Sequence, residues 1–153
     1  IRDAESALGK VLAVADGGVS ANDVSEVLGI PRREALIEFL GLIGRRELAA
    51  TVELLNRLYH EGYEMEHLAK MLVGFFRDAL LSKTAAAGEG VRADSLLPED
   101  RTTLAKHLEG YSASDLAGAI ALFIDALAQS RRAPIPQLPL ELALVKIITA
   151  HEK

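Results

Sequence analysis

A strongly apolar stretch, LPLELALVKII, occupies residues 138–148. Pro139 suits the first turn of a helix, where its missing N–H group would have no partner in any case. The apolar residues that follow cover nearly every face of such a helix: Leu140, Leu142, Ala143, Leu144, Val145, Ile147 and Ile148. Other helices packed on all sides of this helix would explain the pattern. The stretch therefore predicts either the central helix of a bundle or a contact between subunits.

Helical spacing of apolar residues recurs along the rest of the chain. It predicts helices over about 3–15, 20–29, 31–44 and 98–110, two longer ones that form an antiparallel hairpin around Gly62, and one that begins after Ser112. A surface loop is expected from 84 to about 97, and Pro134, Pro136 and Pro139 predict an extended segment before the last helix. No alternating strand pattern competes. The predicted class is all-α, with a short two-helix piece at 1–30 and a bundle of roughly six helices at 31–153.

Side-chain patterns refine these helices. Ser20 with Asp23, and Ser112 with Asp115, have the spacing of N-terminal caps. The expected buried stripes of the two longer helices are Leu48, Val52, Leu55 and Tyr59 on one, and Leu68, Leu72, Phe75, Phe76, Ala79 and Leu80 on the other. The next helix should bury Leu116, Ile120, Phe123 and Leu127.

Composition excludes several classes of function. The 153 residues include no cysteine, which rules out disulfides and thiolate metal sites and favours the cytoplasm. A net charge of -5 argues against a general affinity for nucleic acid, and no stretch has the length of a membrane span. Because Ile1 opens the sequence and residues 1–4 already have a helical pattern, we expect a fragment of a longer protein.

A helix-turn-helix motif is one functional alternative, at residues 20–43. There a short helix, a glycine turn and the basic pair Arg32-Arg33 follow in the required order. Glu34 and Glu38, however, would lie where DNA phosphates approach, and Glu38 falls near a position that the motif fills with an apolar residue. An ordinary helical corner is the favoured interpretation, and no direct DNA binding is expected.

A zinc site is a second alternative, because His60, Glu61, Glu64 and His67 lie within eight positions of one another. Gly62 interrupts the helix between the histidines, so solvated polar residues at a hairpin tip are the favoured interpretation. The isolated His107 and His151 are interpreted in the same way. We expect no metal site and no catalytic residue.

Two basic pairs, Arg45-Arg46 and Arg131-Arg132, lie next to predicted helix ends. They are expected to be solvated or to meet acidic groups of a partner protein. Neither a phosphate-binding Gly-Lys-Ser loop nor a nucleophile-elbow serine occurs in the sequence. This chain alone is therefore not expected to be an enzyme.

Three ordered stretches resemble the gamma/tau subunit (DnaX) of the bacterial DNA polymerase III clamp loader: RDAESAL at 2–8, VSANDVSEVLG at 19–29 and PQLPLELALVKI at 136–147. They are similar to that family's RDALSLL helix, to its V-T-x-x-D-V-x-x-x-L-G segment and to its closing P-x-L-x-L-E-x-A-L-L-R-L helix. Glu5, Gly9 and Lys10 depart from the pattern of the first helix, whose packing they put in doubt.

The resemblance implies a part of an AAA+ ATPase, with the end of its lid subdomain at 1–30 and its collar domain at 31–153. Arg2 would be the sensor 2 arginine, whose guanidinium contacts the phosphates of ATP when the missing ATPase domain is present. ATP and magnesium are thus implied for the parent protein and no cofactor for this chain. The implied partners are other gamma/tau copies, delta and delta-prime through the collar, with psi and chi as further candidates.

Overall fold

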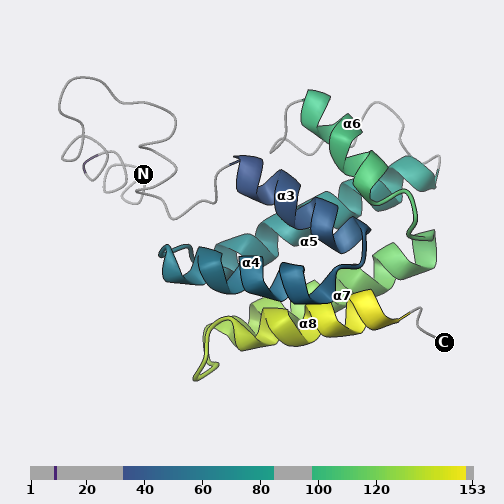
Figure 1. The fold of residues 1–153 in the computed structure, drawn as a ribbon. Helices are drawn as coiled ribbons and strands as arrows, with labels where there is room; N and C mark the ends of the chain where they lie inside the picture. The colour runs from purple at the N-terminus through teal and green to yellow at the C-terminus, as the bar shows by residue number, and fades with distance from the viewer. Residues whose placement is uncertain (1–8, 10–32, 85–97, 151–153) are drawn as a thin grey trace, which may run out of the picture.

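The computed structural model describes residues 33–84 and 98–150 together with Gly9 (Figure 1). This part of the chain forms α3 (Arg33–Gly44), α4 (Leu48–His60), α5 (Met65–Lys83), α6 (Pro98–His107), α7 (Ala113–Ser130) and α8 (Leu138–Thr149), and it contains no strand. The all-α prediction is confirmed. The predicted helices at 3–15 and 20–29, the domain boundary after residue 30, most of the loop before α6, Arg2 and His151 lie outside the described residues.

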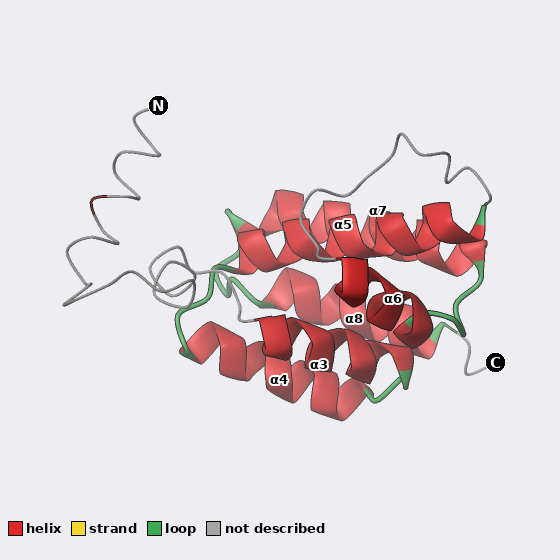
Figure 2. Cartoon of the chain, turned by 90° about the horizontal axis from the view of Figure 1, so that it is seen from above, coloured by secondary structure: helices red, strands yellow, loops and turns green. Residues whose placement is uncertain are grey.

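The helices enclose one apolar core. α5 and α7 pack against each other, and α8 covers the side of α7 (Figures 1 and 2). α4 bridges α8 and α3, while α6 closes the other end against α3 and α5. Aromatic rings fill the centre: Phe76 lies edge-on to Phe123 and to Tyr111, with ring centroids 5.1 and 6.4 Å apart. Such tilted ring pairs add to the stabilisation that burial provides.

Local signals set the beginning of α7. The Ser112 hydroxyl accepts a hydrogen bond from the Asp115 backbone N–H at 3.1 Å, and the Asp115 carboxylate accepts one from the Ser112 N–H at 2.8 Å. This capping box satisfies two amides that the helix leaves unpaired, and the predicted cap is confirmed. Pro139 lies in the first turn of α8, also as predicted.

The prediction of which residues of α4 are buried was correct only for Leu55. The buried residues are Thr51, Leu54, Leu55 and Leu58, whereas Leu48, Val52 and Tyr59 are only partly buried. The predicted hairpin was wrong as well. Gly62 has a positive φ of 92° and does turn the chain, but α4 packs on α3 and α8, and α5 packs mainly on α7. The contacts with α3 and α8 determine which face of α4 is buried.

The apolar stripes of α5 and α7 agree better with the expectation. Leu68, Leu72, Phe75, Phe76 and Ala79 are buried on α5, and Leu80 is partly so. On α7 the deepest positions are Leu116, Ala119, Phe123 and Ala126, with Ile120 and Leu127 at the margins. These two helices make the most extensive pair in the described bundle.

Two further predictions were wrong: the end of α6 and the conformation of the proline segment before α8. α6 ends at His107, and residues 108–110 form a turn rather than the last residues of the helix. The proline segment before α8 is not extended: residues 134–137 are bends and turns, Leu138 N–H donates to Ile135 C=O at 3.1 Å, and Gln137 already has helical φ and ψ of -80° and -21°. The short connection has to bring α8 back along α7, which a straight segment would prevent.

α8 is not the central helix of the bundle. Its buried face consists of Leu140, Ala143, Leu144, Ile147 and Ile148, but Leu142 is 53% exposed and Val145 is 40% exposed. Among the described helices, α4 and α7 cover only one side of α8, so the prediction of burial on every face is wrong for this part of the chain. Of the two sequence-based explanations, the central helix is wrong for the described bundle, and the contact between subunits stays a prediction.

Candidate assembly surface

The exposed large hydrophobic side chains of the described residues gather on two helices and the turn between them. Ile124 of α7 is 49% exposed and Ile135 of the turn 48%, beside Leu142 and Val145 of α8. We call this set of four residues the α7–α8 face. Scattered apolar residues are normal on a protein surface, but exposed large ones that recur on two neighbouring helices are candidates for an interaction site.

Two adjoining hollows lie between these helices. The larger, of about 390 Å³, is lined among others by Ala128, Arg132, Pro134, Leu138 and Leu142. The smaller, of about 120 Å³, has Leu122, Asp125, Pro139 and Lys146 in its wall and shares Leu142 with the first. We refer to both together as the α7–α8 groove. The larger hollow is mainly apolar and the smaller one mainly polar, and an apolar centre beside a polar margin is the usual make-up of a protein interface.

The charged groups at the groove are unpaired within the described part of the chain. Asp125, Arg132 and Lys146 are exposed, and none of their side chains forms a hydrogen bond or an ion pair with another described residue. Exposed charges of this kind contribute little to the stability of a monomer. They are available to steer or orient a partner.

An ion pair holds the turn that forms one end of the groove. Arg131, just after α7, donates two hydrogen bonds to Glu66 in the first turn of α5, at 2.6 and 2.7 Å, and Lys70 approaches the same carboxylate at 2.8 Å. The hydrogen bonds from Arg131, and then those from Lys70, lower the pKa of Glu66 from its ordinary 4.5 to about 2. The same contact raises the pKa of Arg131. The carboxylate therefore stays ionised at neutral pH, and the clamp on the turn persists.

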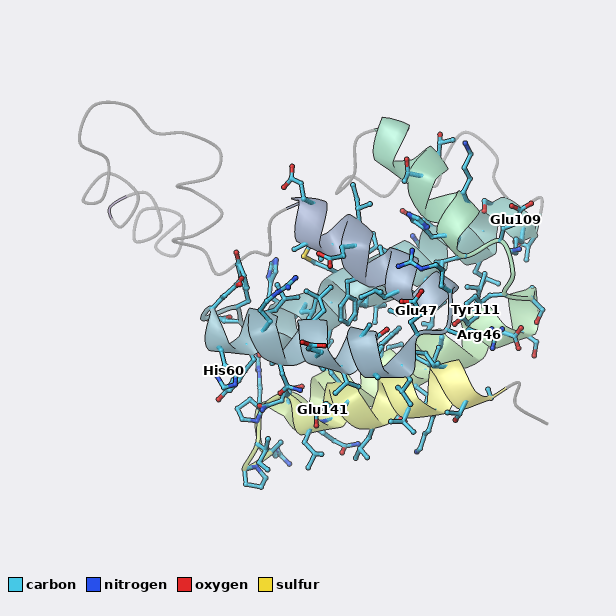
Figure 3. The ribbon with its side chains drawn as sticks, viewed as in Figure 1. Arg46, Glu47, His60, Glu109, Tyr111 and Glu141 are labelled. Atoms are coloured by element: carbon cyan, nitrogen blue, oxygen red, sulfur yellow. The ribbon has the colours of Figure 1, made fainter. Side chains whose placement is uncertain are left out.

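The other arginine pair, Arg45-Arg46, was expected to be solvated or to meet a partner protein. Instead, both arginines contact residues of this chain. The Arg46 guanidinium lies 4.6 Å from the centre of the Tyr111 ring (Figure 3), a cation–π geometry. Tyr111 donates a hydrogen bond to the Ile43 carbonyl at 2.8 Å, and burial raises the pKa of its hydroxyl. Arg46 has a positive φ of 59°, which is uncommon for a residue with a side chain, whereas Arg45 forms an exposed pair with Glu47 at 2.6 Å. Arg46 thus links the α3–α4 turn to Tyr111, which lies two residues before the start of α7.

The zinc candidates are not brought together. His60 is exposed at the end of α4, opposite to Arg46 (Figure 3), and Glu61 and Glu64 are also exposed, while His67 is half-buried. Among the described residues, no three His, Asp or Glu side chains are close enough to share a metal ion. His107 lies elsewhere, at the crossing of α3 and α6 next to Gly41 and Gly44.

The helix-turn-helix alternative can be followed only through α3. The first part of that motif, residues 20–32, lies outside the described residues, so the alternative stays a prediction. On α3, Glu34 and Glu38 are both exposed, and Glu38 meets Arg57 of α4 at 3.4 Å. This part of the helix presents carboxylates, which repel phosphates.

The described residues thus form a helical bundle with a groove between α7 and α8, beside which charged side chains have no partner among the described residues. Comparison with protein families then identifies the class of protein. Residues 19–153 match the family model for DNA polymerase III subunits gamma and tau domain III. The chain belongs to this family of clamp-loader subunits, which act in DNA replication by assembling with other loader components. No curated protein and no solved structure matches the chain.

Several residues of this surface carry no distinguishing signal in the sequence. Ile124 and Asp125 lie outside the buried stripe of α7, and Ile135 lies between two prolines, so no periodic pattern marks them. The excess of apolar residues in α8 was the one signal that pointed to the surface.

No helix among the residues described in the structure is long and apolar enough to cross a membrane.

Proposed function

We propose that this chain holds a clamp loader together by joining its collar to those of neighbouring subunits through the α7–α8 face. The single observation that carries the proposal is the exposure of Leu142 and Val145 on a helix whose composition predicts burial on every side. A neighbouring subunit would cover them and remove apolar area from water, which favours association. The proposed neighbours are other gamma/tau copies, delta and delta-prime in one ring, and psi and chi are further candidates.

For the longer parent protein, we propose that an AAA+ domain binds and hydrolyses ATP with magnesium, and that the lid couples the nucleotide state to loading of the sliding clamp. The resemblance of residues 2–8 to the family's lid helix supports this role, with Arg2 as the phosphate-sensing arginine. Its fixed positive charge and forked N–H donors suit contact with phosphate oxygens. The chain itself would have no ATPase activity. The cysteine-free sequence supports a location in the cytoplasm.

Light scattering of the chain alone, and of its mixtures with delta and delta-prime, tests the assembly role. We expect species heavier than one chain. Leu142→Asp, which places a charge on the apolar face, should weaken each association that uses this face. Ala105→Asp is the matched control, because Ala105 is exposed on α6, and α6 packs on α3 and α5 rather than on α8.

Each outcome of these measurements either supports or contradicts the proposed assembly role. Loss of association in Leu142→Asp together with wild-type behaviour of Ala105→Asp supports the proposal. A chain that stays monomeric at high concentration and joins neither delta nor delta-prime contradicts it. Equal effects of the two variants would show that the assembly contact lies on another surface. Circular dichroism of both variants checks that the helices remain formed.

A further inference from the structure

The exposed sides of α7 and α8 differ in side-chain size. α7 presents mainly small residues, among them Ala117, Ala121 and Ala128, with Ile124 between them. α8 presents the large side chains of Leu142 and Val145. A helix with small exposed residues lets another helix approach closely, and protruding side chains on that second helix fill the space. The two helices are therefore complementary to each other in size, but within one chain these sides point outward.

They are complementary in charge as well. Asp125 on α7 and Lys146 on α8 line the same small hollow. Nevertheless their side chains do not form an ion pair within 4.0 Å, and neither has a charged partner among the other described residues. Within the described residues, α7 thus carries a carboxylate without a charged partner next to small residues. In the same part of the chain, α8 carries an ammonium group without a charged partner next to large ones.

We propose that α8 of one copy of this chain packs on α7 of a second copy, with Lys146 of one facing Asp125 of the other as the pair that selects partner and register. This inference rests on the proposed assembly role and assigns its homotypic contact. The occupant is a second copy because the chain itself supplies both halves of the match: Leu142 and Val145 for the small residues of α7, and Lys146 for Asp125. Charges at the margin of an apolar contact act mainly on specificity and on the rate of encounter.

Charge reversal in separate chains tests the pair. The variants are Asp125→Lys and Lys146→Asp, measured singly and as an equimolar mixture by sedimentation velocity at low ionic strength, where exposed charges are least screened. Each variant alone places like charges opposite each other and should weaken self-association by about tenfold or more. In the mixture the two chains offer opposite charges again, so association between them should return to near the wild-type strength. Lys106→Asp, an exposed change of the same charge on α6, should have little effect.

The mixture of single variants separates the proposed contact from a pair within one chain, and a chain that carries both reversals is the reference, because its charges are opposite in either case. If Asp125 and Lys146 met only inside one chain, the double variant would associate normally while the mixture of single variants would not, and the proposal would be overturned. Both residues are exposed, so the reversals should leave the helices intact, which circular dichroism checks. If either reversal reduces helix content, Asp125→Asn and Lys146→Gln replace them, each with a smaller expected loss.

The remaining outcomes distinguish this inference from the assembly role. Wild-type self-association that no charge variant changes would overturn the Asp125–Lys146 pairing and leave the assembly role standing. Binding to delta or delta-prime without any self-association would also refute this inference alone. A wild-type chain that neither self-associates nor binds those subunits would refute both.

Discussion

Replacing Gly44 by alanine should destabilise the domain, although alanine is the better helix former. Gly44 is the last residue of α3 and meets the backbone of His107 at the end of α6. A Cβ atom there would overlap the His107 carbonyl oxygen and lie 2.9 Å from its carbonyl carbon. Since these are backbone atoms, the two helices must move apart. A crossing this close requires a residue without a side chain.

The magnitude follows from two opposing effects. Forcing extra volume into a packed contact costs about 1–3 kcal/mol, and a backbone obstacle favours the upper end of that range. Alanine regains about 1 kcal/mol of helix propensity relative to glycine. The expected net loss is about 2 kcal/mol, which corresponds to a fall in Tm of about 4–8 °C for a chain of this size.

Urea denaturation followed by far-ultraviolet circular dichroism measures this change. Gly118→Ala is the matched control, because Gly118 is exposed inside α7 and an added Cβ there meets nothing within 4 Å. That variant should be stabilised by up to about 1 kcal/mol. If Gly44→Ala proves as stable as Gly118→Ala, the close approach of α3 and α6 is refuted.

Further predictions concern the α7 cap, the Tyr111 hydroxyl and the Glu66 clamp. Ser112→Ala should lower the free energy of unfolding by about 1 kcal/mol through loss of the cap, and a loss below about 0.3 kcal/mol would contradict the capping role. Tyr111→Phe keeps the ring but removes its hydrogen bond to Ile43, so urea denaturation should show a loss of about 1 kcal/mol; an unchanged midpoint would count against that bond. Because the pKa of Glu66 is lowered from 4.5 to about 2 in the folded chain, its stabilising effect is complete above pH 4.5 and lost as pH falls towards 2. Glu66→Gln should therefore show a flatter dependence of unfolding free energy on pH in this range, and identical pH profiles for variant and wild type would argue against the clamp.

Features that depend on neighbouring residues in the chain were the most predictable. The capping box at Ser112 and Asp115, the proline in the first turn of α8 and the turn at Gly62 depend on groups within a few positions of each other. The stripes of α5 and α7 were recognisable for a similar reason, because helical periodicity brings their apolar residues onto one side. These local preferences agree with the final fold, as they do in most natural proteins.

Features that depend on distant residues were predicted poorly. The face that α4 buries is set by its contacts with α3 and α8, and Thr51 rather than Val52 is buried. The position of Arg46 over Tyr111 joins two turns far apart in the sequence, and neither residue carries a signal of the other. The Glu66–Arg131 clamp likewise joins the start of α5 to the end of α7.

α8 shows the division between sequence and structure most clearly. Its composition by itself determined that the segment is a helix and that most of its side chains are apolar, because hydrophobicity and helical period are properties of the chain. Composition could not determine which neighbours cover each side, because burial depends on where the other helices lie. Only the tertiary structure decided that α4 and α7 cover one side and leave Leu142 and Val145 exposed beside Asp125 and Lys146.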